Sequence, residues 1–264
     1  MYNLYRYKLY AYKKYVYKSE NDSSGGIKMP HINKKRNGTK LQIIRLAAHL
    51  FIEEGYSKTT FNKMAKQLDI SPGNITFYFP SKEHLLAVLV DEMFDFQEWL
   101  MDYEAREGAS SLLSYCLELT SIAAACEEDE VTRDFFASSY SSVMILNKIR
   151  ENDTEKTKRI FGEYRPEWSD EEWRATENIV SGIEFATIMT CEADTPLDKQ
   201  IEKALDSILM LYGVPEELRL QKIGKVLAMD YRNIGRRILN GFKEYIDRVN
   251  EENLKEVRKA SKFK

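Results

Sequence analysis

The stretch Thr60–Leu86, TFNKMAKQLDISPGNITFYFPSKEHLL, constrains the fold of this chain more than any other segment. Apolar residues at i, i+3, i+4 and i+7 mark one face of a short helix, and the hydroxyl of Thr60 can cap its start. This helix stops at Asp69. Ser71 then caps a second helix, and Pro72 takes its first position, where a missing N–H costs nothing. The pattern predicts two short helices joined by a tight turn.

The second helix has two unlike faces. Ile75, Tyr78 and Phe79 fall on one side and are expected in the core. The other side holds small or polar residues and one aromatic ring, namely Pro72, Gly73, Asn74, Thr76 and Phe77. A short helix that is anchored by one face and exposes such residues on the other suits the major groove of DNA.

The charge is distributed unevenly along the chain. Residues 1–90 hold fifteen Lys and Arg against six Asp and Glu, a net charge of +9, whereas the remainder carries −12. A basic N-terminal part can bind a polyanion, and the acidic remainder should avoid it. An uneven solvated surface would explain the charge, but not its coincidence with the two-helix motif.

Composition and spacing exclude several classes of protein. Cys116, Cys126 and Cys191 are odd in number and fall in helical patterns, so we expect reduced thiols. The three histidines all precede residue 85 and have no metal-ligand spacing. The sequence has no Ser/His/Asp set and no glycine-rich phosphate loop, which disfavours an α-helical enzyme, and we expect neither a cofactor nor a metal. No apolar run is long enough to cross a bilayer, so we expect a cytoplasmic protein without membrane partners.

The periodicity predicts an all-α chain with no strand and no internal repeat. We expect helices over 38–54, from Ser81 to about Tyr103, and over 109–126, 129–150 and 153–164. Ser169 and Glu172 form a capping box that opens a helix near Asp170, running to about Cys191. Another helix follows Thr195-Pro196 and ends at Gly213, and Pro215 opens a last helical region to about Val249, broken near Asp230.

Both ends of the chain differ from the rest. Residues 1–30 alternate tyrosine with lysine and then become polar, so we expect a disordered or mis-assigned extension rather than a clasp for nucleic acid. We expect a DNA-binding domain over 36–85, with its motif at about 60–79. A helical regulatory and dimerisation domain over 86–250 and a basic tail over 251–264 would follow.

Segment 40–96 resembles the TetR family of transcriptional regulators. The resemblance lies in AAHLFIEEGY, TTFNKMAKQL and ISPGNITFYFPSK with the following EHLL, about a fifth of the chain. It implies a three-helix helix-turn-helix domain followed by a helical ligand-binding and dimerisation domain. It also implies a repressor that leaves its operator when a small-molecule effector binds.

The resemblance assigns DNA contacts residue by residue. Thr60 and Lys82 sit at phosphate-binding positions, and Gly73 lets the backbone approach DNA. Asn74 matches a reader of adenine, and Phe77 could touch a thymine methyl. The predicted DNA-contacting set is Thr60, Ser71, Pro72, Gly73, Asn74, Thr76, Phe77 and Lys82.

Each assignment has a plainer structural reading. Thr60 and Ser71 act as caps with or without DNA, Asn74 could be an ordinary surface residue, and Lys82 could be solvated. Phe77 could pack against the first helix. The family pattern also has two departures here. Asp69 replaces a turn glycine, which its tolerance of left-handed backbone allows. Thr76 replaces a common phosphate-binding tyrosine and has a shorter reach.

Family members are homodimers, and the resemblance places the interface at roughly 170–191 and 197–213. Two symmetric recognition helices then require a pseudo-palindromic operator on double-stranded DNA. The same apolar faces could instead lie inside one subunit. We expect the effector pocket among the helices that follow the motif, with candidate lining residues Phe96, Trp99, Tyr115, Cys116, Phe136, Tyr140, Met144 and Glu184.

Two questions stay open at this level. The candidate pocket residues could all be plain core, and Glu184 could either pair with an arginine or face a cationic ligand. The alternative function is a DNA-bound scaffold that binds protein partners instead of a small molecule. The C-terminal extension 214–264 favours that alternative, and an interior without a cavity would favour it further.

Overall fold

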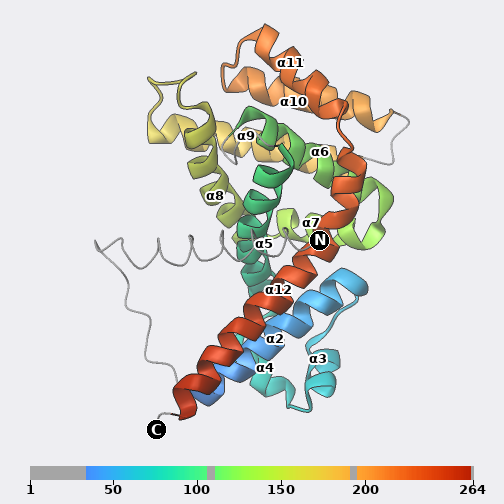
Figure 1. Cartoon of the computed structure of the whole chain (residues 1–264), viewed down its shortest axis with the longest axis vertical. Coiled ribbons are helices and arrows are strands. Elements are labelled where there is room, and N and C mark those ends of the chain that lie inside the picture. Colours follow the sequence, from blue (N-terminus) through green and yellow to red (C-terminus); the bar gives the residue numbers. More distant parts are fainter. Residues whose placement is uncertain (1–33, 106–110, 191–194, 263–264) are drawn as a thin grey trace. The chain divides into compact units, whose positions relative to one another are not determined.

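The computed structural model describes residues 34–105, 111–190 and 195–262. Every regular element in these ranges is a helix (Figure 1), as the periodicity predicts. The helices are α2 (Lys34–Glu53), α3 (Phe61–Leu68), α4 (Pro72–Tyr78), α5 (Lys82–Ala105), α6 (Leu112–Glu128), α7 (Glu130–Ser141), α8 (Val143–Phe161), α9 (Asp170–Met189), α10 (Leu197–Leu211), α11 (Glu216–Leu227) and α12 (Tyr231–Lys262). Among them, none is both long and apolar enough to span a membrane. The predictions for residues 1–30 and for Cys191 lie outside the described residues.

Local capping signals place most helix starts correctly. The Ser169 hydroxyl accepts the N–H of Glu172 at 3.3 Å, and the Glu172 carboxylate accepts the N–H of Ser169 at 2.7 Å. This capping box opens α9 at Asp170 as predicted. Gly55 and Gly213 both have positive φ, at +98° and +77°, where the chain leaves α2 and α10.

Two helix boundaries differ from the prediction. The expected helices over 129–150 and 153–164 are instead α7 and α8, which meet at Ser142. Ser142 has extended backbone, and its hydroxyl accepts the N–H of Ile145 at 3.3 Å, which caps α8. The polar run after Arg150 stays helical, and the Thr154 and Thr157 hydroxyls donate to carbonyls one turn earlier instead of breaking the helix. The last helix also passes the predicted end at Val249, since no Gly or Pro follows to stop it.

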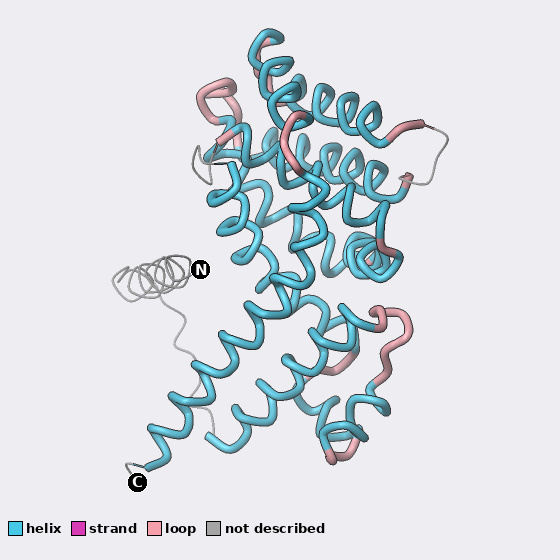
Figure 2. Tube along the Cα trace, turned by 45° about the vertical axis from the view of Figure 1, so that its right-hand side comes forward, coloured by secondary structure: helices cyan, strands magenta, loops and turns pink. Residues whose placement is uncertain are grey.

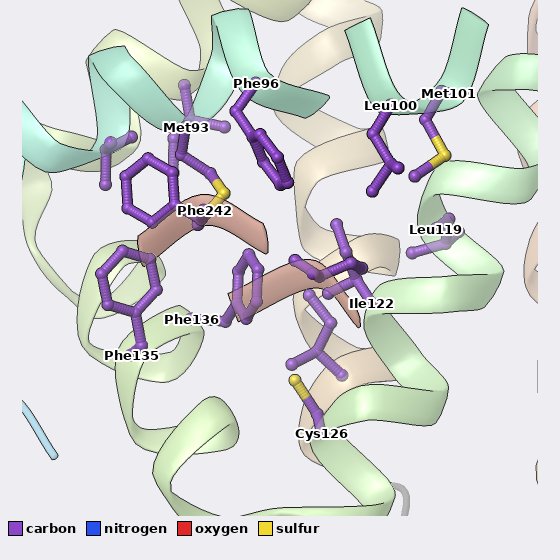
Figure 3. Packing of buried hydrophobic residues seen from close by; sticks show 14 of the residues in the cluster. Met93, Phe96, Leu100, Met101, Leu119, Ile122, Cys126, Phe135, Phe136 and Phe242 are labelled. Carbon is purple, nitrogen blue, oxygen red and sulfur yellow. The ribbon is translucent and has the colours of Figure 1, made fainter. Parts of the chain in front are cut away.

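Helix α6 lies at the centre of the helical bundle. Its side chains are buried almost without interruption from Leu112 to Cys126, so neighbours must cover it on all sides. It contacts α5, α7, α9, α10, α11 and α12. Figure 3 shows Leu119, Ile122 and Cys126 of α6 in the cluster with Phe136 of α7 and Phe242 of α12. Cys116 and Cys126 are free, buried thiols.

The C-terminal helix α12 packs along α6 and then runs beside α2 (Figures 1 and 2). Near its far end Asp247 accepts hydrogen bonds from Arg45 at 2.7 Å and faces His49 at 2.8 Å. Lys243 pairs with Glu53 at 2.8 Å. The extension 214–264 is therefore engaged within the chain, on both α6 and α2.

Gly235 permits the closest approach of α12 to α6. A Cβ atom at this position would lie 2.5 Å from the carbonyl oxygen of Ser121 and 3.2 Å from the amide nitrogen of Ala125. We expect Gly235→Ala to lower the free energy of unfolding by about 1–3 kcal/mol, because backbone atoms have no room to yield. Thermal or urea denaturation measures this change.

Gly224→Ala in α11 is the matched control, since no atom lies within 4 Å of its added Cβ. We expect it to raise stability by up to about 1 kcal/mol, the usual helical preference for alanine. Equal effects of the two substitutions would contradict the close packing at Gly235.

Candidate functional site

Helices α3 and α4 form a helix-turn-helix with the predicted caps. The Thr60 hydroxyl accepts the N–H of Lys63 at 3.3 Å, and the Ser71 hydroxyl accepts that of Asn74 at 3.2 Å. Between the helices, Asp69 has φ 52° and ψ 47°. Aspartate thus adopts the left-handed turn conformation at the position where the family usually has glycine.

Helix α4 buries one face and exposes the other, as its pattern predicts. Ile75 and Phe79 are buried, and Tyr78 is half-buried against the same core. Seven of the eight predicted contact residues are exposed, namely Thr60 before α3 and Ser71, Pro72, Gly73, Asn74, Thr76 and Phe77 at α4. Phe77 is 64% exposed, which excludes the reading in which it packs inside against the first helix. Contact between these residues and DNA stays a prediction.

Thr76 and Lys82 have intramolecular partners that the sequence does not reveal. The Thr76 hydroxyl donates to the Gly73 carbonyl at 3.2 Å. The Lys82 ammonium donates to the carbonyls of Tyr56 and Thr59 at 2.7 and 3.0 Å and lies 4.1 Å from the Tyr56 ring centroid. Desolvation lowers the pKa of Lys82. Lys82 therefore fastens the α2–α3 turn to the start of α5, and its phosphate contact stays a prediction.

Helix α7 also contacts the α2–α3 turn. The Asp134 carboxylate accepts the N–H of Ser57 at 2.8 Å and also its hydroxyl. One residue beyond α7, Ser142 hydrogen-bonds Glu83 near the start of α5. Sequence reasoning missed both contacts, because no local signal pairs residues 59 and 77 positions apart.

A cavity of about 60 Å³ lies among α5, α6, α7, α8 and α9. Four of the residues predicted to line an effector pocket border it, namely Tyr115, Phe136, Tyr140 and Glu184; that an effector binds there stays a prediction. The other lining residues are Val90, Met93, Phe94, Gln97, Glu118, Leu119, Ile122, Phe135, Ser139, Ile149, Asp153, Lys156 and Ile188. The prediction therefore found part of the apolar wall and one carboxylate, and missed the polar residues of α8.

Four predicted lining residues do not border this cavity. Phe96 packs against Trp99 and Phe242 with tilted rings, their centroids 6.0 and 5.8 Å from its own. Cys116 lies within the core, where burial raises the pKa of its thiol to about 12. Met144 is exposed at the surface on α8. Helical spacing marks all four as apolar-face residues without showing which part of the face borders the space.

The polar end of the cavity is a cluster of carboxyl groups. Glu184 accepts hydrogen bonds from the hydroxyls of Tyr115 and Tyr140, both at 3.1 Å. These tyrosines, and not the arginine considered from the sequence, are its hydrogen-bond partners. Asp153 and Glu177 each bring a carboxylate oxygen within 4.8 Å of that of Glu184 and of each other, close enough to hold a metal ion. Burial raises the pKa of all three acids.

A helix-turn-helix of this geometry defines a class of DNA-binding proteins. The sequence pattern of the tetR family of bacterial regulatory proteins matches residues 43–89. Residues 43–89 therefore form a domain of the TetR family.

Similar proteins share mainly this domain. The uncharacterized HTH-type transcriptional regulator YuxN of Bacillus subtilis is 42% identical over 53 residues, 20% of this chain and 18% of its own length. The fatty acid metabolism regulator protein of B. subtilis is 34% identical over 79 residues, 30% of this chain and 40% of its own. The chain thus spans less than half the length of these curated relatives.

A solved structure of the TetR family protein CprB from S. coelicolor A3(2) aligns over 78% of this chain and 98% of its own. Its sequence identity is 19% and its TM-score 0.40.

We expect Lys82→Met to lower the thermal midpoint of unfolding, because it removes charged hydrogen bonds worth about 1.5–3 kcal/mol when buried and less at this half-exposed site. Lys58→Met, at an exposed lysine in the same turn, is the control. An unchanged midpoint would contradict the fastening role.

The slope of DNA affinity against salt tests the phosphate contact of Lys82 separately, because losing one contact reduces that slope by about one unit.

Proposed function

We propose that this protein is a sequence-specific DNA-binding transcriptional regulator, a repressor that a small-molecule effector releases from its operator. The observation that carries the proposal is the exposed face of α4, held at both ends by capped turns in a domain of the TetR family. A bacterial operator lies in the cytoplasm, so the proposal places the protein there.

In this proposal α4 enters the major groove by its exposed face. The Asn74 amide bonds the edge of an adenine in two places, and the Phe77 ring contacts a thymine methyl. Gly73 allows the backbone to approach the duplex. Thr60 and the helix ends contact phosphates, which position the domain without reading sequence.

A homodimer would supply the second recognition helix. The exposed face of α9 supports this: Ala175, Ile179, Gly182, Ala186 and Met189 recur at helical spacing and all face solvent in the single chain. The outer face of α10 is mainly charged, with Met210 as its exposed apolar residue. The interface expected over 170–191 and 197–213 is therefore proposed to centre on α9. Two-fold symmetry would set the half-sites about 34–36 Å apart.

Two helices connect the cavity to the helix-turn-helix. Helix α7 lines the cavity through Phe136 and Tyr140, and holds the α2–α3 turn through Asp134. Helix α5 lines it through Met93 and begins at Lys82. A ligand that displaces either helix would change the separation of the two recognition helices. Such coupling is commonly worth about 1–3 kcal/mol, enough to change occupancy severalfold.

The scaffold alternative loses its main support. The extension 214–264 favoured it as a free surface for a partner, but α12 in that extension packs on α6 and contacts α2. It also expects a filled interior, whereas a cavity of about 60 Å³ lies among α5–α9. We therefore retain the effector-released repressor.

Asn74→Ala tests the reading of sequence. We expect it to relax preference at one base pair, at a cost of about 1–3 kcal/mol, while other positions keep theirs. Selection of bound DNA from a random pool, followed by affinity measurements on single-base variants, measures this. Asn147→Ala, at an exposed position on α8, is the control and should leave the preference intact. A uniform loss of affinity for all sequences in Asn74→Ala would contradict the role.

Ile179→Glu tests the dimer. Ile179 is 58% exposed in the single chain, and a buried unpaired charge at an interface is costly, so we expect a monomer by light scattering and loss of operator binding. Leu220→Glu makes the same change at a residue of α11 that is 56% exposed and off the proposed face. It should leave the dimer intact. Dimers in both variants would place the interface elsewhere.

A further inference from the structure

The cavity is apolar along most of its wall and acidic at one end. Its apolar wall includes Met93, Leu119, Ile122 and Phe136, and its acidic end includes Asp153 and Glu184. Glu177 lies within the same carboxyl cluster. A wall of this kind suits a ligand with an apolar body and one charged group.

The acidic end lacks enough positive charge to balance it. The ionisable groups around it are Tyr115 and Glu118 of α6, Tyr140 of α7, Asp153 and Lys156 of α8, Glu177 and Glu184 of α9, and Tyr212 after α10. The α5 lining residues carry no ionisable group. Lys156 is the single base in this described set, and its ammonium pairs with Glu118. One ammonium group therefore faces four carboxyl groups, an imbalance that burial makes costly.

Two buried polar atoms beside this end have no hydrogen-bond partner. One is Oε1 of Glu177, a residue that is 1% exposed, whose other oxygen accepts from Tyr212 at 2.9 Å. The other is Nε2 of Gln97, which is 5% exposed and lines the cavity. Unsatisfied buried atoms are rare in folded proteins and call for a missing partner. The unmet acceptor on Glu177 calls for a hydrogen-bond donor, which an ammonium group supplies.

We propose that this cavity binds an organic cation, with a ligand ammonium group between Asp153 and Glu184 and a short apolar body along Phe136 and Ile122. The proposal rests on the proposed function only in treating this cavity as the effector site. Tyr115 and Tyr140 already donate to both oxygens of Glu184, an arrangement that favours the carboxylate form once a cation is present.

An ammonium fits this environment better than a divalent metal ion. The Lys156 ammonium already lies on one side of the cluster. It would repel a doubly charged metal ion more strongly than a singly charged ammonium group. The nearest further oxygen atoms belong to Tyr115 and Tyr140, whose hydroxyls already donate to Glu184, and much of the remaining wall is apolar. The alkyl part of an organic cation packs favourably against these apolar walls, because apolar surface of both is removed from water.

Binding should release protons. Burial, followed by the mutual repulsion of the acids, raises the pKa of Glu184 and of Glu177, so the free protein retains protons there that a cation would displace. The sign follows: affinity for an ammonium rises with pH as these carboxyl groups ionise, until the ligand amine itself loses its proton. A neutral ligand would show no such rise.

The test is isothermal titration calorimetry on the full chain without DNA, so that failure here stays distinct from failure of operator binding. The probes are n-butylammonium, n-butanol and butyrate, which share an alkyl chain and differ in charge. We expect n-butylammonium alone to bind, more tightly at about pH 9 than at about pH 6, with proton release shown by the difference between two buffers.

Glu184→Gln keeps the shape of the side chain and removes its charge, while one of the two tyrosine hydroxyls must accept a hydrogen bond instead of donating it. We expect butylammonium binding to weaken about thirtyfold or more. Glu151→Gln, at an exposed position of α8, is the control and should bind as the unaltered chain does. Proton release by the unaltered chain needs no variant and decides the question even if Glu184→Gln fails to fold.

Three outcomes would overturn the proposal. The first is equal binding of butanol and butylammonium, which means an apolar pocket indifferent to charge. The second is unchanged butylammonium affinity in folded Glu184→Gln. The third is binding of magnesium or manganese ions at the cluster with no binding of butylammonium, which would assign the carboxylates to a metal ion.

Discussion

The burial of α6 on all its faces is the constraint on which this structure depends. A helix that is apolar all round must be covered all round, and six other helices contact it. The most extensive of these contacts, between α12 and α6, requires Gly235, where no side chain fits between the two backbones. The cavity lies along the part of α6 that faces α5, α7, α8 and α9, where large aromatic rings meet polar side chains. Both the fold and its candidate binding site thus follow from how one helix is covered.

The helix-turn-helix is joined to this bundle by continuous packing and by a few polar contacts. Helix α5 enters the core directly, while Asp134 and Asp247 reach from α7 and α12 to the α2 region. These carboxylates are half-exposed, and such pairs contribute little stability individually. These contacts fix the position of the helix-turn-helix relative to the bundle, and breaking them costs little free energy. A connection of that kind can be shifted by a coupling energy of a few kcal/mol, which suits a domain whose orientation is to be regulated.

The carboxyl cluster works against the stability of the fold. Its acids have raised pKa values in the folded state, so folding takes up protons and their contribution to stability falls as pH rises. A core of similar volume filled with apolar side chains would avoid that cost. Strongly shifted acids beside a cavity therefore point to a binding role, the more so because Gln97 and Glu177 leave atoms unsatisfied there.

The sequence by itself determined the features that act within one helical turn. The caps at Thr60, Ser71 and Ser169, the left-handed Asp69 and the two faces of α4 all follow from interactions over three or four residues. Only the tertiary structure decided which distant groups meet. Lys82 reaches carbonyls more than twenty residues away, and Glu184 meets Tyr115 and Tyr140 from other helices. The physical reason is that helical periodicity fixes which face is buried, whereas the partner opposite each side chain depends on how separate helices pack.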